Sequence, residues 1–597
     1  MRFVWSLLAS LLTTVVVLVH AQPGFISIDC GIAEGSEYQQ SGQINFVSDV
    51  NFIDSGINHD LPKVALYDKY VHYKNVRSFP DGDRNCYTLR PVDEGSKYLI
   101  RAGFLYGNYD GQNLSPTFDL YLGVDWWATV QNPTTTKQFF EIITLATMDF
   151  VSVCLVNTGK GTPFISVLSL RPLTNSMYNA TNKDQSLKLF GRFDMGSAGA
   201  PIRYPADPLE RVWFYPKMVE GWSRLQTNLT VRNYDDGLKL PSMAMMTAIM
   251  PNGSDIMYFN WTSSQDNQLF HVYKHYAELV PNSVREMTDC CESSCYGPFV
   301  PPYLVAFTVH TDLSSTGGVN QKQYSCWFQK MENSTLPPIL NAIEIYTVLQ
   351  RSKTTTNQED VYAMMNIKSA YKVKRNWMDD PCFPKNYSWE GLTCRNDATD
   401  TAKIIALDLS SSGLNGEISS HIANLRSLES LNLSNNSLEG QVPEFLAKLP
   451  SLSFLNLTGN QLNGSLPSLL LERSKIGLLT LSVGGNRNLC VSGPCSNANG
   501  CGSKGSCGKN KRKIIIPVVA SIFSSVGLLT VLIILWKHSK GAGCQQGAEN
   551  AAEKQPSSSF PSFHNSSRKC NSPPISETAT APKPGPQPTR AKAANAY

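Results

Sequence analysis

LNLSNNSLEGQVP at Leu431–Pro443 is followed by LNLTGNQLNGSLP at Leu455–Pro467, so the same pattern returns after 24 residues. The leucine pairs 407/409 and 479/481 continue this period on either side. Such a period is typical of solenoids, in which each repeat buries its leucines against its neighbours. Residues 401–490 are therefore expected to form a short solenoid of about four repeats.

These segments have the spacing of leucine-rich repeats. The asparagines of the two regular repeats, Asn436 and Asn460, are expected to hydrogen-bond the backbone turns from inside the coil. The outer repeats are less regular, with Ser412 where an asparagine is expected, as is usual for repeats that cap a stack. One residue between the two leucines of each repeat is expected to point from the concave sheet: Asp408, Asn432, Asn456 and Thr480.

Residues 353–400 are expected to supply a connecting helix and the N-terminal cap of the solenoid. Apolar residues at helical spacing predict a helix over Asp360–Tyr371 that packs under the first cap. Cysteines lie on both sides of the repeats, and we pair Cys382 with Cys394 and Cys490 with Cys495 as cap disulfides.

Residues 25–350 lack helical periodicity and show short β-branched or aromatic runs broken by Gly, Pro and Asn, which is typical of all-β sandwiches. They also repeat internally. The pattern Phe-x-x-(Ile/Phe)-Asp-x-Gly occurs at 25–31 and again at 190–196, and two further matches follow in the same order at offsets of about 165 to 175 residues. We predict two homologous sandwiches, at 22–187 and 188–352.

Two long apolar runs predict the membrane topology. Leu7–Val19 reads as the core of a secretory signal peptide, residues 1–21. Ile514–Trp536 is long enough to cross a bilayer and carries no charge. We expect a single-pass type I protein of the plasma membrane, with residues 22–513 outside the cell. A Cys/Gly-rich stalk would occupy 491–513, and 537–597 would form a Pro-rich, disordered cytoplasmic tail.

The N-glycosylation motif Asn-x-Ser/Thr occurs eleven times before the expected span, a density typical of a secreted surface. The sites are Asn113, Asn179, Asn228, Asn252, Asn260, Asn333, Asn386, Asn432, Asn435, Asn456 and Asn463. If Asn432 and Asn456 both carry glycans, the concave face of the solenoid would be shielded. The main body is mildly acidic, which argues against nucleic acid as a partner.

No motif for catalysis, metal or cofactor binding withstands inspection. Gly500–Gly505 fits a nucleotide-loop pattern by letter, but no strand or nucleotide-binding domain surrounds it. Cys290, Cys291 and Cys295 lack the spaced partners of a zinc site, and outside the cell they favour disulfides. Seven aromatic residues of the first sandwich could stack on sugars, although packing in the core is the stronger interpretation: Tyr67, Tyr70, Tyr73, Tyr106, Tyr109, Trp126 and Trp127.

Further motifs make the chain similar to one receptor family. They are FISIDCG (25–31), FDLYLG (118–123), SLRPL (169–173), IRYP (202–205), AEL (277–279) and LPPILNA (336–342). The sequence resembles the tandem malectin-like ectodomain of plant leucine-rich-repeat receptor kinases, the group that includes the symbiosis-receptor-kinase type. The resemblance covers about residues 25–540 and implies a mainly β fold with two malectin-like sandwiches, a short solenoid, one transmembrane helix and a tail.

The chain departs from this family at two places. The family's junction motif Gly-Asp-Pro-Cys appears as Asp379-Asp380-Pro381-Cys382, so a turn that needs this glycine is in doubt. The 61 residues after Trp536 carry none of the kinase motifs, so we expect no kinase activity from this chain. The resemblance implies a receptor-like protein that binds a carbohydrate or peptide ligand, or a co-receptor, and signals through a partner receptor kinase. A ligand-sequestering decoy, a cell-wall carbohydrate tether and a truncated form of a full receptor kinase are the alternatives, with an extracellular enzyme less favoured.

Overall fold

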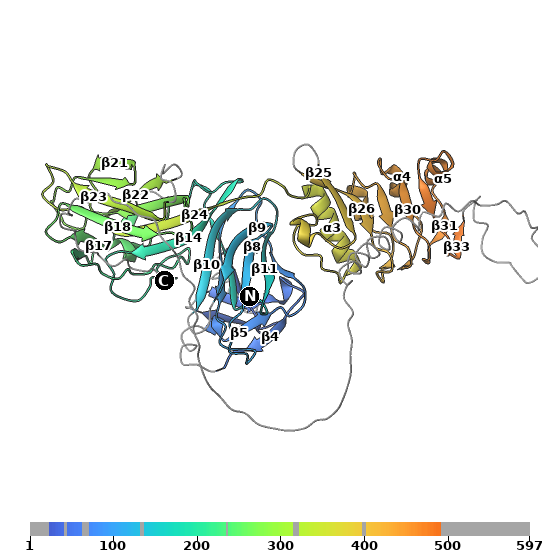
Figure 1. Cartoon of the computed structure of the whole chain (residues 1–597), viewed down its shortest axis with the longest axis horizontal. Coiled ribbons are helices and arrows are strands. Elements are labelled where there is room, and N and C mark those ends of the chain that lie inside the picture. Colours follow the sequence, from blue (N-terminus) through green and yellow to red (C-terminus); the bar gives the residue numbers. More distant parts are fainter. Residues whose placement is uncertain are drawn as a thin grey trace, which may run out of the picture. The chain divides into compact units, whose positions relative to one another are not determined.

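The computed structural model describes residues 23–40, 44–62, 71–131, 137–233, 237–313, 321–396 and 401–490. These residues form mainly β-structure (Figure 1). The predicted signal peptide, stalk, transmembrane segment and tail lie outside them. Among the helices described, none is long and apolar enough to cross a bilayer.

The first sandwich packs its sheets around one apolar core in which Phe104, Phe118 and Phe164 meet edge to face. Its strands are β1 (Ile26–Asp29), β2 (Glu37–Gln40), β3 (Ile44–Ser48), β4 (Ile57–Asp60), β5 (Asn75–Ser78), β6 (Arg84–Leu89), β7 (Lys97–Phe104), β8 (Thr117–Leu122), β9 (Asp125–Val130), β10 (Gln138–Leu145), β11 (Val151–Lys160), β12 (Phe164–Ile165) and β13 (Val167–Leu173). Two short 3-10 turns, η2 (Asp49–Asn51) and η4 (Val71–Tyr73), connect some of them.

The second sandwich has its own core, around Trp213, Phe270 and Phe328. It contains β14 (Gln185–Asp194), β15 (Trp222–Gln226), β16 (Arg232–Asn233), α2 (Ser242–Met245), β17 (Thr247–Pro251), β18 (Ile256–Thr262), β19 (Phe270–Tyr276), β20 (Met287–Cys291), β21 (Ser294–Phe299), β22 (Val305–Asp312), β23 (Gln323–Lys330) and β24 (Ala342–Gln350). β14 begins slightly before the predicted domain boundary at residue 187, so that boundary falls inside a strand.

The internal repeat seen in the sequence has a counterpart in the strand pairing. In the first sandwich the order β1-β13-β7-β10 is antiparallel throughout, and the second sandwich repeats it as β14-β24-β19-β22. The opposing sheets are β6-β11-β8-β9 and β18-β23-β20-β21. The two halves join because β10 pairs with β14, at Ile142↔Lys188 and Ile143↔Leu187, which makes one eleven-stranded sheet.

The repeated Asp-x-Gly motif has a steric reason in both halves. A Cβ on Gly31 would lie 2.3 Å from the carbonyl oxygen of Val76, and one on Gly196 would lie 2.2 Å from the backbone nitrogen of Ala248. Only glycine lets the neighbouring backbone approach this closely. The preceding aspartates, Asp29 and Asp194, are buried at matching positions.

The third part is the solenoid with its N-terminal cap. It contains α3 (Gln358–Tyr371), η5 (Lys385–Tyr387), β25 (Leu392–Asn396), β26 (Ala402–Asp408), β27 (Asn415–Gly416), η6 (Ser420–Asn424), β28 (Ser430–Asn432), β29 (Ser437–Leu438), α4 (Phe445–Lys448), β30 (Phe454–Asn456), β31 (Asn463–Ser465), α5 (Ser468–Lys475), β32 (Thr480–Ser482) and β33 (Asn488–Cys490). β26, β28, β30 and β32 form the parallel ladder of the repeats.

The register of the last repeat corrects the sequence prediction. Leu407, Leu431 and Leu455 stack at the 24-residue period, but Leu455 then pairs with Leu481. The residue in register with Asn456 is therefore Ser482 and not Thr480, which lies on the same face of β32 but in register with Phe454. The final turn is two residues longer because it contains α5, which is longer than the equivalent α4.

Helix α3 begins two residues before the predicted helix because Asn357 caps it. The Asn357 side chain accepts hydrogen bonds from the backbone N–H groups of Glu359 and Asp360. Ala363, Met364 and Ile367 are buried in the same apolar cluster as the repeat leucines, and Val361 is buried beside them on the helix. The predicted packing of this helix under the first cap is confirmed.

Candidate functional site

A buried ionic network fixes the junction between the two sandwiches. Arg192 lies between two carboxylates: its Nη2 is 2.7 Å from Glu141 Oε1, and its Nε is 2.7 Å from Glu344 Oε2. Arg101 Nη2 reaches the other Glu141 oxygen at 2.7 Å. Burial alone would raise the pKa of Glu141, but Arg192 and Arg101 lower it instead. Removing one member would strand a buried charge, so the loss of any of them should destabilise the junction.

A second junction lies between the first sandwich and the solenoid cap. In β11 the side chains of Val151, Val153 and Leu155 enter the sandwich core, so those of Ser152 and Cys154 point to the opposite face of the sheet. Contacts with the cap residues Trp377–Cys382 are made from this outer face. The outer face of the sheet β6-β11-β8-β9 is therefore an interface.

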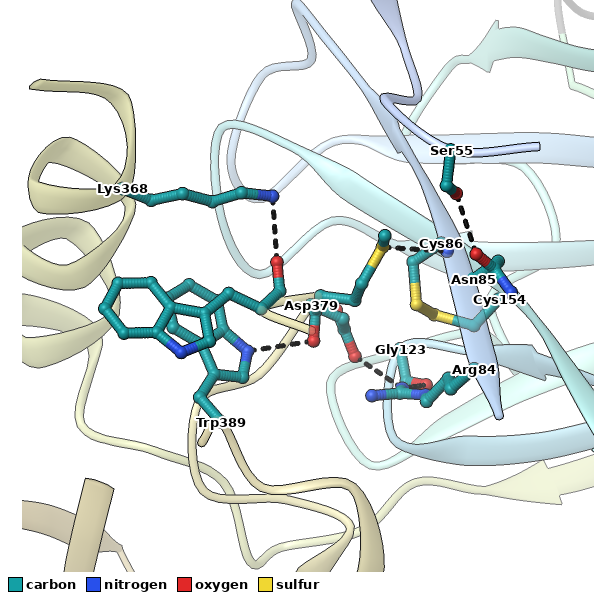
Figure 2. The surroundings of a disulfide bond; sticks show 11 residues. Ser55, Arg84, Asn85, Cys86, Gly123, Cys154, Lys368, Asp379 and Trp389 are labelled. Atoms are coloured by element: carbon teal, nitrogen blue, oxygen red, sulfur yellow. Dashed lines mark hydrogen bonds and ion pairs between the residues drawn. A yellow bond between two sulfur atoms is a disulfide. The ribbon is translucent and has the colours of Figure 1, made fainter. Parts of the chain in front are cut away.

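An ion pair that joins distant parts of the chain crosses this interface. Arg84 Nη2 lies 2.8 Å from Asp379 Oδ2 and also donates to the carbonyl of Gly123 at 2.8 Å, beside the Cys86–Cys154 disulfide (Figure 2). Arg84 is 1% exposed and Asp379 is 7% exposed. The backbone N–H of Cys86 donates to the sulfur of Met378 at 3.4 Å. The contact is thus well shielded from water.

Asp379 is the residue at which the chain departs from the Gly-Asp-Pro-Cys motif named in the sequence analysis. Its φ of 58° is in the left-handed region, which favours glycine. The sequence suggested that this turn was in doubt, but the turn forms with aspartate, whose carboxylate pairs with Arg84. Asp380 holds the turn from inside, since it accepts from the backbone N–H groups of Thr356, Cys382 and Phe383 at 2.9 Å each.

Two tryptophans and one lysine of the cap pack against or hydrogen-bond the turn that contains Asp379. Trp377 and Trp389 stack with centroids 4.9 Å apart and an interplanar angle of 18°. Trp389 Nε1 donates to the carbonyl of Met378 at 3.0 Å, and Lys368 Nζ donates to the carbonyl of Trp377 at 2.8 Å (Figure 2). Cys382 and Cys394, the pair named from the sequence, are joined by a disulfide in this cap.

A cavity of about 340 Å³ opens beside this ion pair. The turn between β8 and β9, the end of β10, the start of β11, the chain after β24, helix α3 and Asp379–Asp380 contribute to its walls. Its charged lining residues are Asp125, Arg351, Asp379 and Asp380. Asp379 and Asp380 were singled out from the sequence, but Asp125 and Arg351 were not, because nothing in the residues around them marks a site.

The concave face of the solenoid presents a polar ladder of Asp408, Asn432, Asn456 and Ser482. Asn432 Nδ2 donates to Asp408 Oδ2 at 3.2 Å. Burial would raise the pKa of Asp408, but hydrogen bonds from Ser410 and Asn432 lower it. Asn432 and Asn456 are half-buried there, whereas nine predicted glycosylation sites are exposed: Asn113, Asn179, Asn228, Asn252, Asn260, Asn333, Asn386, Asn435 and Asn463.

The aromatic residues of the first sandwich are mostly core. Tyr73, Tyr106 and Trp127 are buried, and Tyr109 packs against the same core. Trp126 is 38% exposed, with Lys188 Nζ 4.9 Å from the centre of its ring. Tyr67 and Tyr70 lie outside the described residues. The five that are described do not assemble a shared platform for a sugar.

The cysteines that resembled a metal cluster are disulfide-bonded. Cys290 pairs with Cys295, and Cys291 pairs with Cys326. Among the described residues no group of three or more metal-ligating side chains comes together. Cys495 lies outside the described residues, so its pairing with Cys490 stays a prediction.

Comparison with known proteins covers both the sandwiches and the repeats. The chain is 42% identical over 546 residues to the probable LRR receptor-like serine/threonine-protein kinase At1g05700 of Arabidopsis thaliana, with 89% of this chain and 62% of that protein aligned. It is 44% identical over 530 residues to the Arabidopsis LRR receptor-like serine/threonine-protein kinase IOS1, with 87% and 58% aligned. The chain spans about three fifths of the length of these curated relatives.

Among solved structures, the Arabidopsis thaliana ANX2 ectodomain aligns with 54% of this chain and 96% of its own, at 15% identity and a TM-score of 0.46. A family profile described as leucine rich repeat matches residues 404–462. A second profile, described as malectin-like domain, matches residues 28–348, the span of the two sandwiches. The chain therefore belongs to the malectin-like domain family, with leucine-rich repeats after its sandwiches.

Proposed function

We propose that this protein is a plant plasma-membrane receptor-like protein that binds an extracellular ligand or co-receptor and passes the signal to a kinase. The supporting observation is that the similarity to proteins named receptor-like kinases runs through both the sandwiches and the repeats, over 89% of the chain. The described residues would supply recognition, and a partner receptor kinase would supply phosphorylation. We propose no catalytic or cofactor-binding role for them.

Affinity purification of the tagged chain from plant membranes, followed by mass spectrometry, tests this proposal. Reproducible recovery of a receptor kinase supports it and identifies the output. Recovery of cell-wall polysaccharide or a secreted peptide, with no kinase, would contradict it and favour the tether or the decoy. Sequencing the 3′ end of the transcript distinguishes the receptor-like protein, the tether and the decoy from a truncated form of a full receptor kinase.

We further propose that partners approach the sandwiches or the flank of the solenoid and not its concave face. Asn432 and Asn456 stand on that face, and each is followed two residues later by Ser434 or Thr458, as the glycosylation motif requires. Two glycans there would cover most of a four-strand ladder. Glycopeptide mapping that finds both sites unoccupied would contradict this proposal.

A further inference from the structure

The cavity at the junction between the first sandwich and the cap has an apolar wall and a polar wall. Leu145, Met148, Phe150 and Val361 supply the apolar wall. Its volume of about 340 Å³ falls in the range of small-ligand sites. It can accept one long side chain or a small organic molecule, with aliphatic carbon against one side and a polar group against the other.

One hydroxyl in this cavity is buried without a hydrogen-bond partner. Ser152 is 3% exposed, lines the cavity, and its Oγ has no partner among the protein atoms. Buried polar atoms are nearly always satisfied, so an unpaired one in a cavity indicates where a ligand atom or a water binds. The sheet alternation described above directs this side chain toward the cap and away from the sandwich core.

The carboxylates of the cavity differ in how many hydrogen bonds and ion pairs they already form with the protein. Asp380 accepts three backbone hydrogen bonds, and Asp379 pairs with Arg84. Asp125 is 8% exposed and accepts one hydrogen bond, from the backbone N–H of Ser352 at 2.8 Å. Its Oδ2 lies 3.7 Å from Arg351 Nε, which is beyond hydrogen-bond distance. Asp125 therefore retains capacity for a donor.

The charge balance of the site favours a cation. The lining contains three carboxylates and one guanidinium, and Arg84 behind the wall offsets Asp379. When all these groups are ionised, one negative charge is left in excess; burial raises the pKa of Asp125 and of Asp380, so a bound cation would also favour their charged form. Arg351 cannot turn freely toward a ligand anion, because its Nη1 donates to the carbonyl of Leu145 at 2.8 Å.

We propose that this cavity binds an aliphatic cation, a protonated amine or guanidinium on an apolar stem, with Asp125 and Ser152 accepting its hydrogen bonds and the apolar wall covering the stem. A lysine or arginine side chain of an extracellular peptide has this chemistry, and so has a free diamine. The peptide case rests on the proposed function, since it gives the class of ligand that the receptor would recognise.

Binding is measured on the full-length chain, purified in detergent, with an N-acetylated pentapeptide amide whose central lysine is flanked by alanine and glycine. The control peptide carries norleucine, which keeps the stem and lacks the charge. A charge-assisted hydrogen bond predicts about tenfold tighter binding of the lysine peptide. Putrescine as competitor represents the free diamine. A lysine analogue with a photoreactive diazirine locates the site by mass spectrometry of the cross-linked residues.

Two variants connect binding to this cavity. Asp125→Asn keeps an acceptor for Ser352 and removes the charge, so it should abolish the preference for lysine over norleucine. Ser152→Ala loses no internal hydrogen bond, so it should fold normally and weaken binding of both cations. Asp255→Asn, at an exposed carboxylate of the second sandwich, is the matched control and should change nothing.

Equal affinity for the lysine and norleucine peptides, or cross-links that all fall outside the cavity-lining segments 122–125, 144–152, 351–361 and 379–380, would overturn the inference. Binding of putrescine without the peptide would support the cation site and identify a free amine as its occupant. The proposed function is tested separately, because recovery of a kinase does not depend on this cavity. A kinase recovered with no cation preference would refute the cavity ligand alone.

Discussion

Replacing Asp379 by glycine, the residue that the Gly-Asp-Pro-Cys motif would place here, is expected to destabilise the junction although it relieves backbone strain. Glycine at a φ of 58° recovers about 1 kcal/mol. The change also leaves the guanidinium of Arg84, which is 1% exposed, with the carbonyl of Gly123 as its hydrogen-bond partner and the ring of Tyr387 5.9 Å away, but with no carboxylate. Breaking a buried pair on one side costs about 3–5 kcal/mol, so we expect a net loss of about 2–4 kcal/mol in the local stability of the junction.

A double-mutant cycle separates the ion pair from other effects. Arg84→Met alone should also destabilise, because it leaves the Asp379 carboxylate buried without its cation. The variant with both Arg84→Met and Asp379→Gly removes both charges and should be more stable than the sum of the single losses predicts, by about 2 kcal/mol or more. Hydrogen-exchange mass spectrometry of peptides covering residues 84–89 and 377–394 reports the local opening free energy on the full chain.

The matched control is an exposed pair in the solenoid. Arg395 Nη1 lies 2.6 Å from Glu429 Oε1, with the two side chains 60% and 39% exposed. Solvent screening makes such pairs weak even when they are bidentate, so the cycle Arg395→Met with Glu429→Gln should show a coupling of about 1 kcal/mol or less. Additive losses at Arg84 and Asp379 would refute the view that aspartate replaces glycine here because it forms this pair.

Three further predictions concern the sandwiches and the last repeat. Gly196→Ala should prevent stable folding of the second sandwich, while Gly199→Ala, with no atom closer than 4.0 Å to the added Cβ, should not; thermal melts check both. Burial raises the pKa of Asp29 and of Asp194 to about 7 from an ordinary 3.8, so the folded state binds these protons more tightly and loses stability as pH rises from about 4 to about 7. Urea unfolding across this range should show that fall in the native chain and a smaller one in the variant with both aspartates changed to asparagine; identical slopes would contradict it. Asn486→Ala removes three hydrogen bonds of the last turn and should cost about 2–4 kcal/mol, measured by hydrogen exchange in β31 and β33.

The sequence predicted features that depend on local periodicity. The repeats, helix α3 and the duplicated sandwich motif all follow from spacings along the chain, because each repeat or strand packs on a neighbour of the same pattern. The same reasoning failed at the last repeat. Because leucines stand at 478, 479 and 481, the pair 479/481 fits the 24-residue period although the repeat is two residues longer. The same shift of two residues is why Asn486 was not recognised as the ladder asparagine of the last repeat.

The junction and its cavity could not be predicted from such spacings. Arg84 and Asp379 are 295 residues apart in sequence, and Asp125 and Ser152 sit in strands that look like any other strand of the sandwich. Their meeting depends on which face of a sheet the cap covers. The only sequence signal was the departure from glycine at position 379.

The two junctions of the molecule differ in what would have to break for them to open. Between the sandwiches, backbone pairing of β10 with β14 is reinforced by Arg192 and its two buried glutamates, so separation would expose strand edges and charges together. Between the first sandwich and the cap, the contact consists mainly of side chains, including the ion pairs Arg84–Asp379 and Lys368–Asp54, and it encloses a cavity. A ligand in that cavity would touch residues of both parts and add to the energy that holds them together. The second junction is therefore the place where binding can change the coupling between the sandwiches and the solenoid.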